Sequence, residues 1–244
     1  MLNILMIILL VLNLVFNLAD AVRERDAGEI LKWNERWCIS LPFGENGEED
    51  KSVCPDGDWC LVLVNKWNPM EADGDIELKQ LSNGHAVDER IYPSLQQMMD
   101  DARSAGLSPV ICSSYRTVSD QQELYSAKVE KYLSQGLSPE AAEAEAAKWV
   151  ALPGTSEHHT GLAVDIVARS YQMLDKNQEN TAEQKWLMAN SWRYGFILRY
   201  PNGSTDITGI IYEPWHYRYV GKTAAEEIYT RGITLEEYLE DYYG

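Results

Sequence analysis

Hydrophobic and polar positions divide the 244-residue chain into an apolar start, a mixed polar stretch and a long region of regular patterns. Residues 2–18 are apolar apart from three asparagines, and the charged segment VRERDAGE follows almost at once. A run that is apolar on all faces is typical of a signal peptide or a membrane anchor, and Ala-Asp-Ala at 19–21 has the small-x-small pattern of a cleavage site. No Lys or Arg precedes the run, and its length is borderline for a membrane span, so both alternatives stay open. We therefore predict that residues 1–21 are a signal peptide or an N-terminal anchor, and that the protein is extracytoplasmic, secreted or held at the membrane.

Residues 22–58 are polar and contain the acidic cluster GENGEED and the turn CPDGD, which predicts a linker and a small irregular subdomain. Regular patterns begin at Trp59, and we assign residues 59–244 to one domain. Apolar runs bounded by turn residues predict strands, at 60–65, 108–113, 162–168, 196–200, 207–213 and 215–220. Helical patterns begin at cap residues and end at Gly or Pro, over 88–105, 119–135, 138–150, 181–194, 223–231 and 235–243. Ser119 and Ser138 are the predicted N-caps of two of these helices.

The predicted strands and helices do not alternate as regular βαβ units. This order favours an α+β fold with a mainly antiparallel sheet flanked by helices. An apolar fraction of 45% with eight tryptophans is enough for a well-packed core. The net charge of −17 argues against a nucleic-acid partner and against electrostatic docking to anionic lipid.

The four cysteines do not form a zinc-binding pair, because none of them are spaced as C-x-x-C. In an exported chain, one disulfide among Cys38, Cys54 and Cys60 is expected, but the sequence does not determine the pairing. Cys112 lies in the apolar run LSPVICSS, which predicts a buried small hydrophobe rather than a nucleophile.

Two clusters of side chains can carry chemistry. The segment SEHHTGLAVDIV (156–167) contains two adjacent histidines and an acid, and EPWH (213–216) contains a glutamate and another histidine. Two imidazoles and a carboxylate with one open position are the ligand set of a catalytic zinc ion, and a further carboxylate could act as its base. Read alone, each fragment is more often a set of hydrogen-bonded structural residues. Similarly, Arg116 in SSYRT could bind an anion, although a surface salt bridge is the more common role.

The spacing of these residues does not prove a metal site. His158 and Asp165 are seven positions apart, and a straight strand would place their side chains on opposite faces. Gly161 offers a break between them, and Pro214 lies between Glu213 and His216. A shared site therefore requires turns or bulges at these points.

Three motifs in this order resemble the VanY-type zinc D-alanyl-D-alanine carboxypeptidases, with the LdcB-type L,D-carboxypeptidases as close relatives. The resemblance covers about residues 59–233, and its S-x-H-x-x-G-x-A-x-D pattern is met by Ser156, His158, Gly161, Ala163 and Asp165. The E-P-W-H element is Glu213 to His216, and the S-x-Y-R-S-x-x-x-Q element appears as SSYRT with Gln121. Ser114 stands where the family usually has Gly, and Thr117 replaces a serine.

The resemblance implies the hedgehog and D,D-peptidase type of zinc peptidase fold and one zinc ion. It implies His158, Asp165 and His216 as zinc ligands, and Glu213 as general base and acid. His159 has no role in the family, where its position often holds Gln. The remaining roles concern the substrate: Arg116 stabilises the oxyanion or the terminal carboxylate, and Ser156, Gln121 and Trp215 line the site.

The implied activity is removal of the C-terminal D-alanine from peptidoglycan stem peptides, and we expect the protein to be a monomer. The membrane is a partner only through the possible N-terminal anchor. An L,D-carboxypeptidase that acts on tetrapeptide stems is the first alternative. A non-catalytic cell-wall-binding module on the same fold is the second, and the intact Glu213 argues against it.

Overall fold

The computed structural model describes residues 58–70 and 74–243. The predicted signal peptide or anchor, most of the predicted N-terminal subdomain, and Cys38 and Cys54 lie outside these residues, so those expectations stay predictions. Within the described part of the chain, no helix is long and apolar enough to cross a membrane.

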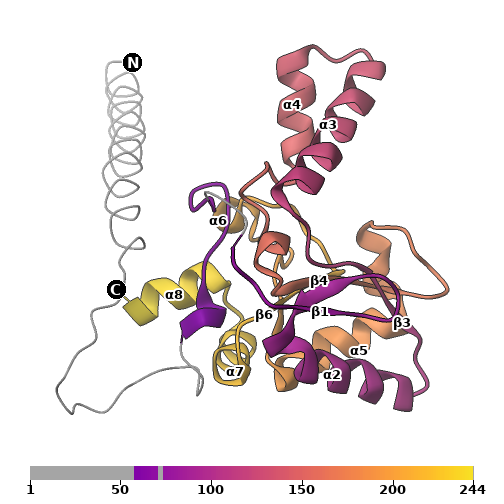
Figure 1. Ribbon diagram of the computed structural model, residues 1–244, viewed down its shortest axis with the longest axis vertical. Coiled ribbons are helices and arrows are strands. Elements are labelled where there is room, and N and C mark those ends of the chain that lie inside the picture. Colours follow the sequence, from indigo (N-terminus) through magenta and orange to yellow (C-terminus); the bar gives the residue numbers. More distant parts are fainter. Residues whose placement is uncertain (1–57, 71–73, 244) are drawn as a thin grey trace, which may run out of the picture. The chain divides into compact units, whose positions relative to one another are not determined.

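The centre of the fold is a four-stranded sheet in which every neighbouring pair is antiparallel, with the order β3–β4–β6–β5 (Figure 1). A separate antiparallel hairpin is formed by β1 and β2. The described strands are β1 (Leu78–Gln80), β2 (Ala86–Asp88), β3 (Pro109–Ser113), β4 (Ala163–Ala168), β5 (Phe196–Leu198) and β6 (His216–Tyr219). The predicted antiparallel α+β class is therefore confirmed.

Helices surround this sheet. The described α-helices are α2 (Tyr92–Ser104), α3 (Val118–Ser134), α4 (Pro139–Ala147), α5 (Ala182–Asn190), α6 (Thr205–Thr208), α7 (Lys222–Arg231) and α8 (Leu235–Tyr243). Short 3₁₀ helices are η1 (Asp58–Leu61), η2 (Glu89–Ile91), η3 (Glu157–Thr160), η4 (Lys176–Asn180) and η5 (Ser191–Tyr194). The paired helices α3 and α4 project away from the sheet as a helical hairpin (Figure 1).

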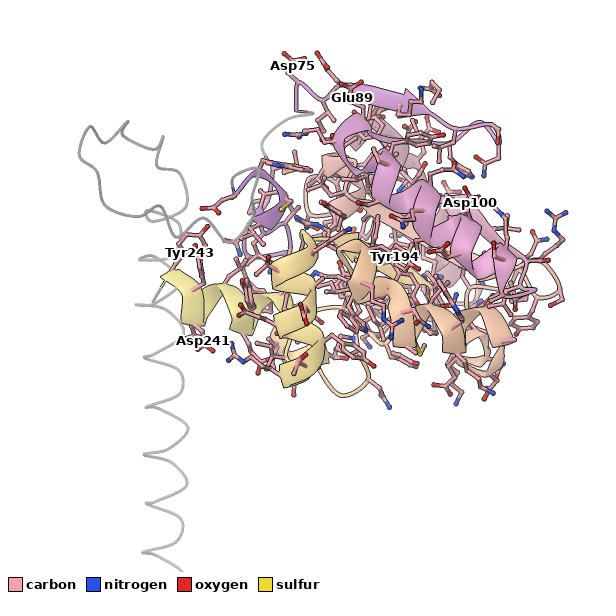
Figure 2. All side chains as sticks on the ribbon, turned by 90° about the horizontal axis from the view of Figure 1, so that it is seen from below. Asp75, Glu89, Asp100, Tyr194, Asp241 and Tyr243 are labelled. Carbon is pink, nitrogen blue, oxygen red and sulfur yellow. The ribbon has the colours of Figure 1, made fainter. Side chains whose placement is uncertain are left out.

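The main core lies between the sheet and helices α2 and α5. Helix α2 buries Leu95, Met98, Met99 and Ala102, which recur at helical spacing on one side, while the opposite side carries exposed residues such as Asp100 (Figure 2). The central strand β4 is buried at all six positions, so it fixes the site residues that it carries in a rigid environment.

The strand predicted at 60–65 is wrong, although the expected burial is right. Leu61 and Val64 are buried, but the segment begins as η1 and forms no ladder. The carbonyl oxygens of Cys60 and Val62 instead accept hydrogen bonds from the guanidinium of Arg218, at 3.0 and 2.7 Å. The side chain of Arg218 thus satisfies carbonyl groups that, in a strand, would bond to a neighbouring strand.

The strand predicted at 207–213 is also wrong. This segment contains the end of α6, where Thr208 Oγ1 accepts a hydrogen bond from the backbone N–H of Ile210 and Gly209 has a φ of +77°. The helix predicted from Ser119 begins earlier, because Thr117 and Asp120 form a reciprocal capping box. Ser138 is confirmed as an N-cap.

Candidate metal centre and active site

The central strands bring two of the predicted ligands together. β4 and β6 pair with Asp165 directly opposite His216, so the two side chains share one face of the sheet. His158 comes from η3, and Gly161 ends that helix with a φ of +70°. A Cβ atom at position 161 would lie 2.8 Å from the backbone nitrogen of Asp88, so this break requires glycine. The turn at Gly161 explains how His158 and Asp165 can meet, although a straight strand would place their side chains on opposite faces.

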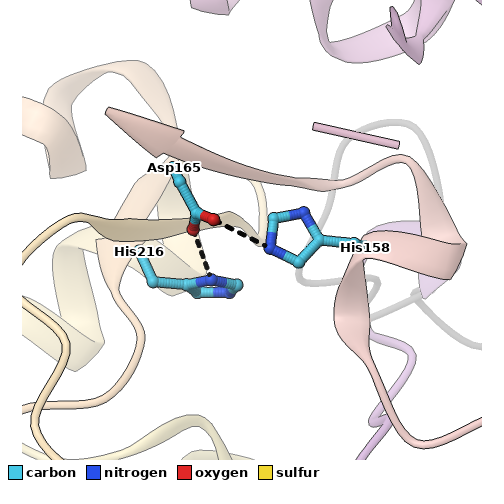
Figure 3. Close-up of side chains that lie close together, drawn as sticks. All are labelled: His158, Asp165 and His216. Atoms are coloured by element: carbon cyan, nitrogen blue, oxygen red, sulfur yellow. Dashed lines mark hydrogen bonds and ion pairs between the residues drawn. The ribbon is translucent and has the colours of Figure 1, made fainter. Parts of the chain in front are cut away.

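These three side chains form a compact buried group (Figure 3). Each offers one nitrogen or carboxylate oxygen, and these atoms all lie within 4.8 Å of one another. His158 Nε2 is 3.4 Å from one oxygen of Asp165, and His216 Nδ1 is 2.9 Å from the other. Among residues 58–70 and 74–243, this is the one group of His, Cys, Asp and Glu side chains able to hold a metal ion.

A neighbouring carbonyl group determines which ring nitrogen of His158 carries the proton. His158 Nδ1 lies 2.8 Å from the carbonyl oxygen of Ser114, which can only accept, so Nδ1 carries the proton and Nε2 keeps its lone pair. Burial and the nearby Arg116 lower the pKa of His158 to about 4, so the ring is neutral. A neutral imidazole oriented by a backbone carbonyl is ready to bind a metal through Nε2.

His216 is a cation when no metal is bound. Burial acts to lower the pKa of this imidazole, but its contacts with Asp165 and Glu157 outweigh burial and raise the pKa to about 9. Burial likewise acts to raise the pKa of Asp165, and the two imidazoles outweigh it and lower that pKa. The carboxylate of Asp165 is therefore ionised, as a metal ligand must be.

His159 points to different partners. Its Nδ1 lies 2.8 Å from the carbonyl oxygen of Arg116, and its Nε2 accepts a hydrogen bond from the backbone N–H of Gly154 at 3.2 Å. Both ring nitrogens are thereby used, and the side chain is fully buried. His159 holds two loops of the site together and is outside the metal-ligating group.

Glu213 lies beside the group without belonging to it. The turn at Pro214 and Trp215 is closed by a hydrogen bond from His216 N to the carbonyl oxygen of Glu213, and Glu213 Oε2 is 3.9 Å from His216 Nδ1. Burial raises the pKa of Glu213 to about 8, against an opposing effect of His216. A carboxyl group with a pKa near neutrality can both accept and donate a proton.

Arg116 follows β3 and is joined to η3 through a hydrogen bond from its backbone N–H to the carbonyl oxygen of His158. Its Nη1 donates to Ser113 Oγ at 2.9 Å, and its buried Nε has no hydrogen-bond partner among the described residues. Burial lowers the pKa of Arg116, while Asp165 and Glu213 act to raise it. This arginine is consequently no surface salt bridge, and its guanidinium has donors left for an anion.

A cavity of about 220 Å³ contains the whole group. The substrate-lining residues expected from the sequence all border it: Ser156, Gln121 and Trp215. Its wall also includes Lys128 and Trp149 from the α3–α4 region, with Trp149 43% exposed. Gln121 is held by a hydrogen bond to the carbonyl oxygen of Ala151, so its amide has a fixed orientation.

A second cavity, of about 280 Å³, lies between α2, β3 and the β1–β2 turn. It is larger, but its lining includes no His, Cys, Asp or Glu, and its charged groups are Arg103 and Arg169. A cavity without an imidazole or a carboxylate offers neither a metal-ligand set nor a general base, so the smaller cavity is the candidate active site.

Two residues of the site are missed by the sequence analysis. Glu157 is fully buried and lies 3.5 Å from His216 Nε2, and the ring of Tyr200 lies 4.8 Å from the ring of His216. Tyr200 gives no local signal. Glu157 does give one, because a charged residue beside His158 in an otherwise buried segment needs a partner.

The family comparison is specific. The sequence profile of "VanY: D-alanyl-D-alanine carboxypeptidase" matches residues 84–222. A D-alanyl-D-alanine carboxypeptidase of Enterococcus faecalis is 48% identical over 200 residues, covering 80% of this chain and 73% of the relative.

Solved structures agree with the profile. A zinc(II) complex of the vancomycin-resistance D,D-pentapeptidase VanY is 50% identical with a TM-score of 0.68, covering 74% of this chain and 99% of that one. VanYB in complex with D-alanine-D-alanine is 51% identical with a TM-score of 0.68, covering 75% and 98%. The LdcB L,D-carboxypeptidase is 34% identical with a TM-score of 0.61, covering 82% and 97%. This chain belongs to the VanY family of D-alanyl-D-alanine carboxypeptidases.

Proposed function

We propose that this protein is a zinc-dependent D,D-carboxypeptidase that removes the terminal D-alanine from peptidoglycan stem peptides outside the cytoplasm. One observation carries the proposal: a buried His-Asp-His group lies beside a carboxyl group of raised pKa, within one cavity of a VanY-family chain. The zinc and D-alanyl-D-alanine complexes of similar proteins support the choice of metal and substrate.

The donor set fits zinc. His158 Nε2, one oxygen of Asp165 and His216 Nδ1 are the atoms that would hold the ion, and two nitrogens with one oxygen leave a position open for chemistry. When bound, zinc supplies Lewis acidity, which polarises the scissile carbonyl and makes water a nucleophile at neutral pH.

Glu213 moves the protons. Its carboxylate would accept a proton from the attacking water and then pass it to the nitrogen of the departing D-alanine.

Arg116 supplies positive charge. Its unpartnered Nε and its Nη groups can donate to the developing oxyanion or to the terminal carboxylate of the substrate. Gln121, Ser156 and Trp215 would confine the last residues of the stem peptide against the metal.

The test of this mechanism replaces Glu213 with Gln. The amide cannot accept the proton, so we expect release of D-alanine to fall by about 10²-fold or more while zinc remains bound. D-Alanine release from a defined pentapeptide stem and zinc content are measured together. Glu240→Gln, the same change at an exposed position of α8, serves as the matched control. Near-normal turnover of the zinc-loaded Glu213→Gln variant would contradict the role of Glu213.

Substrate choice is tested separately, because an LdcB L,D-carboxypeptidase also has this fold. We expect faster hydrolysis of pentapeptide stems than of tetrapeptide stems, in line with the higher identity to VanY proteins. Mass spectrometry of the products, with and without a chelator, decides between the two activities. Preferential cleavage of tetrapeptides would make the L,D activity the correct one.

A further inference from the structure

A buried ionic network lies behind the metal centre. It consists of two acids and two arginines, all buried, and their formal charges cancel. Its members are Glu157, Arg199, Arg218 and Glu236. Even when each charge is paired, a buried ionic cluster is often no more stabilising than apolar residues of similar volume, so this cluster calls for an explanation beyond general stability.

The network fixes one oxygen of Glu157 completely. Glu157 Oε1 accepts from Arg199 Nε at 2.7 Å and from Arg218 Nη1 at 2.9 Å. Arg199 in turn holds Glu236 with two hydrogen bonds, at 2.8 and 2.7 Å. Asn65 Nδ2 donates to the same Glu236 at 3.2 Å. The carboxylate of Glu157 therefore cannot rotate without breaking two charged hydrogen bonds.

The other oxygen faces the metal centre. Glu157 Oε2 is buried without a hydrogen-bond partner among the described residues, and so is Nε2 of His216. These two atoms lie 3.5 Å apart, while the opposite ring nitrogen, Nδ1, lies beside Asp165. A carboxylate in this place is an acceptor for a proton on Nε2, and a proton there would leave the lone pair on Nδ1, beside Asp165.

We propose that Glu157 is a positioning residue of the metal centre, which orients the ring of His216. Glu236 on α8 and Asn65 help to hold Glu157 in place through Arg199. The inference rests on the proposed zinc site and deepens it. Asn65 and Glu236 both lie outside residues 84–222, which the family profile matches. Two segments beyond the matched region thus contribute to the orientation of His216.

The chemistry of the network suits this role. Two arginines neutralise the two acids, so Glu157 presents a strong acceptor to His216 without adding net charge to the site. The planar guanidinium of Arg199 donates two hydrogen bonds to Glu236 on α8 and a third to Glu157. The position of α8 therefore affects the position of the Glu157 carboxylate.

The first test measures the zinc affinity of Glu157→Gln by competition with a chromophoric chelator. Gln keeps the shape but lacks the charge, and we expect zinc to bind about 10- to 100-fold more weakly. The unfolding temperature is measured with and without zinc for each protein. If Glu157 positions His216, zinc should raise the unfolding temperature of Glu157→Gln less than that of the wild type. If the role of Glu157 is purely structural, the substitution should lower the unfolding temperatures with and without zinc equally. An unchanged zinc affinity with equal lowering would overturn the inference.

The second test uses α8, in case Glu157→Gln does not fold. Glu236→Gln should weaken zinc binding in the same direction but less, and Glu240→Gln, on the exposed side of the same helix, should not. Equal zinc affinities of Glu236→Gln and Glu240→Gln would show that Glu236 does not help to position Glu157. Wild-type protein that fails to bind zinc at all would contradict the proposed function instead, so the two failures are distinguishable.

A spectroscopic readout completes the test. In zinc-loaded protein labelled with ¹⁵N-histidine, we expect His216 to carry its proton on Nε2, with a resonance shifted downfield by the carboxylate of Glu157. The shift should decrease in Glu157→Gln. A proton on Nδ1 of His216, with Nε2 bound to the metal, would overturn the orientation proposed for this ring.

Discussion

His158 and His159 are neighbours in the chain, but their ring nitrogens meet different partners. Ser114 fixes Nδ1 of His158 and leaves Nε2 beside Asp165, while Arg116 and Gly154 use both nitrogens of His159. The difference arises because successive residues of the short helix η3 point in different directions. Proximity in sequence therefore says little about which histidine could bind a metal.

The two histidines should respond differently to substitution. We expect His158→Ala to abolish zinc binding, because it removes a ligand. His159→Gln should keep zinc and lose about 1–3 kcal/mol of stability, because one buried hydrogen bond is imperfectly replaced. Zinc content and the free energy of unfolding are the measurements. Equal loss of metal in both variants would contradict the assignment of His158 as the ligand.

The raised pKa of His216 predicts a pH dependence of metal binding. Below about pH 9 the ring of the metal-free protein holds a proton that zinc must displace from Nδ1. Zinc affinity should therefore fall roughly tenfold per pH unit between pH 9 and pH 7. Chelator competition at several pH values checks this, with proton release followed by calorimetry in two buffers. An affinity independent of pH would mean that His216 is already neutral.

At the scale of elements, the α3–α4 hairpin forms one wall of the cavity. Lys128 Nζ from α3 lies 5.0 Å from the centre of the Trp149 ring, which follows α4, and both residues border the candidate active site. Leu124 is 44% exposed on the same wall. An exposed aromatic and apolar surface beside a cation suits a peptide that extends beyond the two terminal D-alanines.

Substitution of this wall should separate long substrates from short ones. We expect Trp149→Ala to raise KM about tenfold for a full stem peptide, equivalent to roughly 1.4 kcal/mol of lost binding, with little change for a short acyl-D-alanyl-D-alanine. Leu133→Ala, at a similarly exposed position of α3 away from the cavity, is the control. Equal effects on both substrates would mean that Trp149 acts on the reacting end.

Elements with a clear hydrophobic pattern could be predicted from the sequence. Segments whose backbone groups are satisfied by distant side chains could not. β4 and α2 follow from continuous apolar and helical patterns. The segment at 60–65 looks like a strand because it is apolar, but its carbonyl groups bond to Arg218, which is distant in the chain. The sequence does not predict the hairpin of β1 and β2, because β1 has the sequence LKQ and is largely exposed, so it shows no apolar run.

The candidate site follows from the resemblance rather than from spacing. Its motifs are local, and the resemblance that they carry implies His158, Asp165 and His216 as ligands, which the structure brings within 4.8 Å of one another. The network that involves Glu157 and Glu236 could not be predicted, because it joins side chains from segments far apart in sequence. Patterns along a chain do not contain such pairings.

At the scale of the whole molecule, the metal should stabilise the fold. A ligand that binds the folded state at 100 times its Kd adds about 2.7 kcal/mol, which corresponds to roughly 5–10 °C in Tm for a domain of this size. We expect a chelator to lower Tm by this order and added zinc to restore it. His158→Ala should show no such response. A chelator-insensitive Tm in the wild-type protein would indicate that the group does not bind zinc.

The register of β4 and β6 has a consequence for the donor set. Asp165 and His216 are 51 positions apart and meet only because the two strands are aligned residue for residue. A slip by a single residue would turn one of them to the opposite face, and no trio of donors would form. The complete set of three donors therefore exists only in a chain whose strands β4 and β6 are paired in this register.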